Sequence, residues 1–190
     1  MVNFVDHFII EVHMFIAKEK YKTNIVEYIL YMFHIEDIIR SNELNIDKLY
    51  RTIISKYNLS DNQLENITNW YIDLIHQMKN ADIQSSGHLP FLKELIFKLN
   101  DLHIQLLNSL EEERYVELYH WASNYIKELK NKMNQPEMTE IEVCLNGLYG
   151  VMLLRMKNQE ISSETTEVMS LFGQMLRYLT KRYHENLHRK

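Results

Sequence analysis

Apolar residues recur at helical spacing along almost the whole chain. Over residues 23–41 they cover most of the circumference of a helix: Ile25, Val26, Ile29, Leu30, Met32, Phe33, Ile35, Ile38 and Ile39. Since a surface helix needs only one apolar stripe, this breadth predicts a central helix that is buried on most sides.

Six more segments carry an apolar stripe with the helical period. They lie near residues 46–57, 60–78, 89–110, 111–129, 139–156 and 162–183. Three helix starts are marked by a capping box, in which Ser or Thr is followed three residues later by Glu or Gln. These pairs are Ser60–Gln63, Ser109–Glu112 and Thr139–Glu142.

The predicted fold class is all-α. Only four glycines and two prolines interrupt the chain, whereas sheet proteins need turn residues about every ten positions. Mostly short connections between about seven helices favour antiparallel neighbours, arranged as a single bundle or as an array of helical hairpins. No internal repeat supports a regular solenoid.

The strongly patterned part of the chain begins at Met14. Residues 1–13 contain a short apolar stretch, but acidic residues interrupt it and no basic segment precedes it, so it does not resemble a signal peptide. We expect residues 1–13 to be a loosely attached N-terminal extension and residues 14–190 to form a single helical domain.

Composition narrows the classes of function. The single cysteine, Cys144, excludes an internal disulfide and indicates a reducing, cytoplasmic setting. A formal net charge of −5 argues against nucleic-acid binding, and no apolar run approaches the roughly 20 residues of a membrane span. No cofactor is predicted, because Gly147 and Gly150 lie within a helical pattern rather than in a phosphate-binding loop; they predict close helix packing instead.

Charged residues interrupt the apolar pattern of the first predicted helix, over residues 23–41. Glu36 and Arg40 fall on an apolar face, and Asp37 lies at its edge. Because a buried charge needs a partner, their spacing of four predicts an ion pair between Glu36 and Arg40. Two interpretations stay open: a structural salt bridge, or a polar pocket that binds a ligand and to which Arg155 could contribute.

The histidines offer little chemistry. The sequences Asp73-x-x-His76 and Glu117-x-x-His120 have the spacing of di-metal bundle ligands, but both fall opposite an apolar stripe, so no metal site is predicted. His103 falls within a stripe and is expected to be a hydrogen-bonded core residue. Since no histidine lies in a nucleophile motif, no catalytic residue is predicted.

The two tryptophans, Trp70 and Trp121, lie at the margins of their apolar stripes. Aromatic residues at such positions cover the edge of a core or anchor a protein interface. Both interpretations stay open, and the two residues are the candidate interface positions.

Three segments together resemble a known family: residues 24–40 (NIVEYILYMFHIEDIIR), residues 145–150 (LNGLYG) with 153–155 (LLR), and the carboxy-terminal helix. The chain is similar to a bacterial family of small helical proteins known only as a domain of unknown function. The resemblance covers nearly the whole chain from Met14. It implies an all-helical fold and a bacterial cytoplasmic setting, and it implies no activity, cofactor or catalytic residue.

These observations favour a non-catalytic helical interaction or scaffold module, whose partner is another protein or a second copy of the chain. The alternative is a small-ligand-binding bundle or an unrecognised enzyme built around Glu36, Asp37, Arg40 and Arg155.

Overall fold

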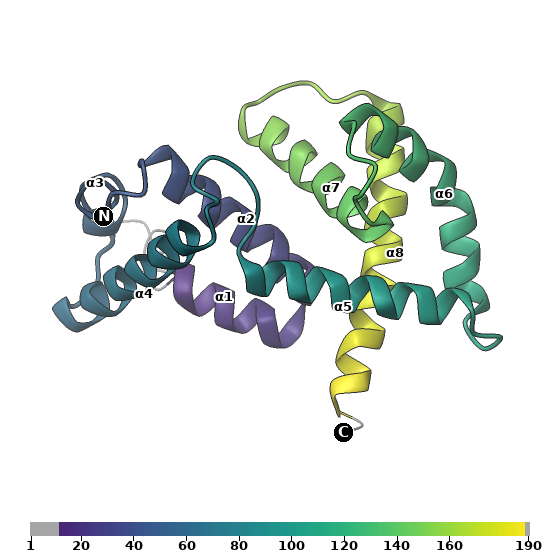
Figure 1. Cartoon of the computed structure of the whole chain (residues 1–190), viewed down its shortest axis with the longest axis horizontal. Helices are drawn as coiled ribbons and strands as arrows, with labels where there is room; N and C mark the ends of the chain where they lie inside the picture. Colours follow the sequence, from purple (N-terminus) through teal and green to yellow (C-terminus); the bar gives the residue numbers. More distant parts are fainter. Residues whose placement is uncertain (1–11, 189–190) are drawn as a thin grey trace, which may run out of the picture. The chain divides into compact units, whose positions relative to one another are not determined.

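A computed structural model describes residues 12–188 of the chain. Within this range every regular element is helical, in eight α-helices and one short 3-10 helix (Figure 1). They are α1 (Val12–Thr23), α2 (Ile25–Ser41), α3 (Ile46–Thr52), η1 (Ile54–Lys56), α4 (Asp61–Asn80), α5 (Pro90–Leu107), α6 (Glu113–Met133), α7 (Glu140–Met156) and α8 (Ser163–His188). The predicted all-α class is confirmed. The eighth α-helix, beyond the seven predicted, is α1. None of the described helices is long and apolar enough to cross a membrane.

The chain divides into two compact units, an N-terminal unit that ends at Lys93 and a C-terminal unit that begins at Glu94. A cluster of contacts is not by itself an independently folding domain. The single helical domain predicted over residues 14–190 therefore stays a prediction. Of the predicted extension, residues 1–11 lie outside the described residues, and residues 12 and 13 begin α1.

In the N-terminal unit, α1 packs against α2 and α4, while α3 and η1 pack against α4. Helix α2 is buried along one side and half-buried over most of the rest, since only Glu27 and Ser41 of its residues are exposed. Asn24 separates α1 from α2, because its extended backbone breaks the helix and its side chain accepts a hydrogen bond from the Glu27 N–H at 3.1 Å.

In the C-terminal unit, α6, α7 and α8 pack against one another. Gly147 lies on the buried side of α7, where a Cβ atom would stand 2.9 Å from Leu129 Cδ2 and 3.3 Å from Met169 Cε. The predicted close packing is thus confirmed at Gly147. It is wrong at Gly150, which has open space where a Cβ would stand.

Two of the three predicted capping boxes are confirmed, at Ser60–Gln63 and Thr139–Glu142. The third is wrong: α6 begins at Glu113 with Glu112 as its N-cap residue, and Ser109 lies in the preceding turn. The physical reason is that the Glu112 carboxylate is taken by α8. It accepts a hydrogen bond from the Tyr178 hydroxyl at 2.6 Å and pairs with Arg182 at 2.8 Å.

Candidate functional site

Glu36, the central residue of the predicted polar cluster, is fully buried in α2. Its Oε1 atom accepts a hydrogen bond from the Leu89 backbone N–H at 2.7 Å. Its Oε2 atom lies 2.6 Å from Nδ1 of His88. Both oxygens of the carboxylate therefore hold the end of the loop that leads from α4 into α5.

His88 is fixed on two sides. In addition to its contact with Glu36, its imidazole ring stacks on the Phe33 ring, with centroids 3.7 Å apart and planes 15° apart. The side chain keeps 27% of its surface exposed. A half-buried histidine with one ring nitrogen on a carboxylate is oriented rigidly, which stabilises the loop at its last turn.

Arg40 holds the same loop from a second point. Its guanidinium pairs with Asp37 at 3.1 Å, and it also donates hydrogen bonds to the Ile83 carbonyl at 3.4 Å and to the Gly87 carbonyl. The predicted Glu36–Arg40 pair is therefore wrong, since each side chain takes different partners. Apart from Asp37, these partners lie more than 40 residues away in the sequence, so helical spacing alone could not indicate them.

Gly87 is the loop residue whose conformation requires glycine. Its φ angle is +93°, in a region that side chains with a Cβ atom rarely adopt. A Cβ atom there would also stand 3.2 Å from Ile83 Cγ2. The backbone path that presents the Gly87 carbonyl to Arg40 thus depends on this glycine.

Two predicted site residues lie in the C-terminal unit. Arg155 is exposed in the last turn of α7, where a cation complements the partial negative charge of the helix end. Trp121 on α6 keeps 45% of its surface exposed, and the Arg114 guanidinium lies 5.4 Å from its ring centre. Glu36, Asp37 and Arg40 lie together on α2 in the N-terminal unit. Arg155 and Trp121 belong to helices of the C-terminal unit.

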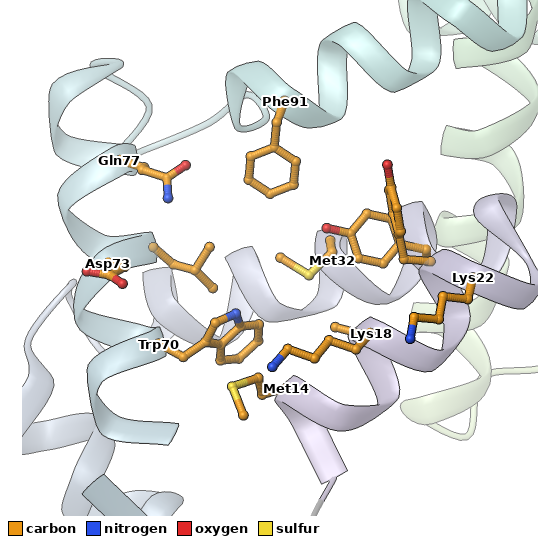
Figure 2. A pocket seen from close by; sticks show the side chains of 12 residues that line it. Met14, Lys18, Lys22, Met32, Trp70, Asp73, Gln77 and Phe91 are labelled. Atoms are coloured by element: carbon orange, nitrogen blue, oxygen red, sulfur yellow. The ribbon is translucent and has the colours of Figure 1, made fainter. Parts of the chain in front are cut away.

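Trp70 lines a groove of about 410 Å³ in the N-terminal unit (Figure 2). We name this hollow the Trp70 groove. One wall is a single face of α1, the other a face of α4, and α2 and the first turn of α5 complete it. Its lining residues are Met14, Ala17, Lys18, Tyr21, Lys22, Tyr28, Met32, Trp70, Asp73, Leu74, Gln77 and Phe91.

The lining of the Trp70 groove is mainly aromatic, aliphatic and methionine. Tyr21 and Tyr28 meet edge to face, with ring centroids 5.1 Å apart. Burial, with a smaller contribution from Tyr21, raises the pKa of Tyr28 to about 12, so its hydroxyl is neutral at physiological pH. Figure 2 shows Phe91 and Trp70 projecting into the space between the helices, with Gln77 on the side of Phe91 and away from Trp70. Flexible methionines and broad aromatic rings suit apolar groups of varied shape.

The C-terminal unit holds a separate buried polar network around His103. Its Nδ1 atom lies 2.7 Å from the Tyr115 hydroxyl and its Nε2 atom lies 3.0 Å from Glu140. Tyr119 donates a further hydrogen bond to Glu140 at 2.9 Å. The hydrogen bond from His103 is the largest of the contacts that hold the pKa of Glu140 below its ordinary value, against the opposing effect of burial. The prediction that His103 is a hydrogen-bonded core residue is confirmed.

The predicted orientation of His76 and His120 is also confirmed, since both side chains are exposed. Among residues 12–188, no group of three or more His, Cys, Asp or Glu side chains is arranged to hold a metal ion. Burial, followed by the nearby Glu140, raises the pKa of the Cys144 thiol well above its ordinary value, so this cysteine behaves as a small apolar residue.

Sequence reasoning identified Trp70 but missed the groove around it. A signal was present: Met14, Ala17, Lys18 and Tyr21 share one helical face, as do Trp70, Asp73 and Gln77. The sequence does not show that these two faces lie on opposite sides of a groove, because their relative position depends on how α1 packs.

Fold and site define an all-helical protein whose N-terminal unit carries an open, aromatic-lined groove. The chain belongs to the family described as Domain of unknown function (DUF4924), whose family model matches residues 14–189. The resemblance inferred from three segments to a family of unknown function is thereby confirmed. No curated protein and no solved structure matches the chain.

Proposed function

We propose that this protein is a non-catalytic helical interaction module, and that the Trp70 groove receives apolar side chains of a protein partner. The observation that carries the proposal is the groove itself, in which one tryptophan, two tyrosines and two methionines line a hollow of about 410 Å³. Tryptophan, tyrosine and methionine are enriched at interfaces relative to the rest of a protein surface.

The openness of the Trp70 groove favours a protein partner over an enclosed metabolite. Tyr21 keeps 47% of its surface exposed, and Lys18 and Lys22 are also exposed. Small-molecule sites bury most of the ligand surface. A groove between two helix faces instead suits the apolar face of another helix, which leaves its polar side in water.

The alternative, a ligand pocket around Glu36, receives less support. Each of Glu36, Asp37 and Arg40 has a partner within the protein, although the Arg40 Nε atom is buried without one among the described residues. None of the three residues lines the Trp70 groove. Their geometry favours the structural interpretation, in which they fasten the loop between α4 and α5 to α2. For the setting of the interaction we propose the cytoplasm, supported by the single cysteine of the sequence.

Site-specific photo-crosslinking tests the proposal. A benzophenone amino acid replaces Gln77, which lines the groove, and in a control protein it replaces His76, the neighbouring exposed residue that does not. The chain is irradiated in native cell extract. We expect one discrete product at position 77 and none at position 76. Equal products at both positions, or none at either, would overturn the proposal. A product with the mass of two chains would identify the partner as a second copy.

A further inference from the structure

The charged residues of the Trp70 groove are divided between its two walls. Lys18 and Lys22 lie one helical turn apart on α1, and Asp73 lies across the groove on α4 (Figure 2). One rim of the groove is therefore cationic and the other anionic.

The two groove lysines are not neutralised by other described residues. Within residues 12–188, neither Lys18 nor Lys22 takes part in an ion pair, whereas Lys20, between them, pairs with Glu27 on α2. Lys18 does make a cation–π contact with Phe15, with its Nζ atom 5.8 Å from the ring centre, and that contact leaves its charge uncompensated. Two like charges four residues apart on a helix repel each other, so an anion placed beside both relieves this repulsion.

From this division of charge we infer that the occupant of the Trp70 groove is an acidic amphipathic segment of a partner protein. Its apolar side chains pack against Trp70, and its Asp or Glu residues face Lys18 and Lys22. Asp73 disfavours acidic groups at the opposite rim, so it fixes the direction in which the segment lies. This inference rests on the proposed function and adds to it the chemistry and orientation of the partner.

Selection from a random peptide library tests the inference with the partner still unidentified. Displayed peptides of about 12 residues, about three turns when helical, are selected against the full chain. Parallel selections use Trp70→Ala, the double variant Lys18→Glu/Lys22→Glu, and Lys79→Glu. Lys79 is the matched control, because it is an exposed lysine of the same unit that does not line the groove. Circular dichroism verifies that each variant is folded.

The expected result has three parts. Peptides selected by the wild-type chain carry apolar residues at helical spacing together with an excess of Asp and Glu, and they fail to bind Trp70→Ala. The double variant selects peptides rich in Lys and Arg, whereas Lys79→Glu selects the acidic set. For one acidic peptide, Lys18→Gln and Lys22→Gln each weaken binding by about two- to fivefold, as expected for exposed ion pairs.

The outcomes separate the two proposals. The selected peptides could require Trp70 but show no excess of Asp and Glu, and bind the double variant as well as the wild-type chain. This result would overturn the inference and leave the proposed function standing. Failure to select any Trp70-dependent peptide would overturn both. Dodecanoate is tested by calorimetry in parallel. If it binds in a Trp70-dependent manner and no peptide does, the occupant is a small amphiphilic anion and the inference is wrong.

Discussion

Glu36 shows how a buried carboxylate can serve the fold rather than chemistry. One oxygen accepts the Leu89 N–H and the other meets His88, so the side chain ties α2 to a loop more than 50 residues away. Leaving a buried donor without its acceptor costs more than an ordinary hydrogen bond contributes. We therefore regard Glu36 as a determinant of the loop conformation.

Substitution of Glu36 tests this role. Glu36→Gln weakens the contact with His88 and removes the charge, and we expect it to lower the free energy of unfolding by about 1–3 kcal/mol. Asp37→Asn is the control, since the Asp37 side chain is 44% exposed and its pair with Arg40 contributes less than about 1 kcal/mol. Urea denaturation measures both. Equal losses for the two variants would contradict the assigned role of Glu36.

The network of His103 and Glu140 predicts a dependence of stability on pH. The pKa of Glu140 is lower in the folded protein than its ordinary value of 4.5, chiefly because of the hydrogen bond with His103. The unfolded chain therefore binds the proton more readily than the folded protein does. The contribution of ionised Glu140 to the free energy of unfolding is complete above about pH 4.5 and is lost as pH falls through the folded-state pKa. Glu140→Gln should show a weaker loss of stability over that range in denaturation curves. An unchanged pH profile would contradict this account.

At the scale of single residues, the sequence predicted which polar side chains are buried better than it predicted their hydrogen-bond partners. The apolar faces placed Glu36 and His103 inside, and both are buried. The prediction that Arg40 is the partner of Glu36 was wrong. Helical spacing indicates neighbours on the same helix, whereas His88 and Leu89 come from a loop that is distant in the sequence. A buried charge could be located from sequence, but the group that satisfies it could not.

Among the elements, α7 carries two glycines in different surroundings. A Cβ atom at Gly147 would collide with the Leu129 side chain at 2.9 Å, whereas Gly150 has nothing within 4 Å. A glycine within a helix costs about 1 kcal/mol relative to alanine. The packing of α6, α7 and α8 therefore explains Gly147 and gives no reason for Gly150.

Alanine substitutions distinguish the two positions. Gly150→Ala should stabilise the protein by about 0.5–1 kcal/mol, because it gains helix propensity without a clash. Gly147→Ala should gain less or lose stability, since Leu129 and Met169 must move. Thermal unfolding of both variants checks the order. A larger gain at Gly147 than at Gly150 would contradict the close packing described for α7.

The helices themselves were largely predictable, because long apolar stripes and capping boxes mark most of them. One helix and one boundary were not. Helix α1 was not predicted as a separate element, whereas the start of α2 after its N-cap residue Asn24 lies within two residues of the predicted start. At the start of α6, the capping pattern of Ser109 and Glu112 was overridden by the tertiary contacts of Glu112 with Tyr178 and Arg182.

For the molecule as a whole, the candidate function depends on an arrangement that no single segment encodes. Trp70 and Trp121 look alike in sequence, as aromatic residues at the margin of a stripe. The structure distinguishes them, since Trp70 lines a groove with other aromatic residues and Trp121 lies exposed beside Arg114. Our central claim is that the first of these two residues belongs to the binding surface.

The most direct test is the effect of each tryptophan on photo-crosslinking from position 77. Trp70→Ala removes the indole ring from the α4 wall of the groove and should reduce the yield of the cross-linked product by more than about tenfold, a loss typical of a central interface tryptophan. Trp121→Ala should leave the yield within about twofold. The account is contradicted if Trp70→Ala, verified as folded, gives the wild-type yield, or if Trp121→Ala abolishes the product instead.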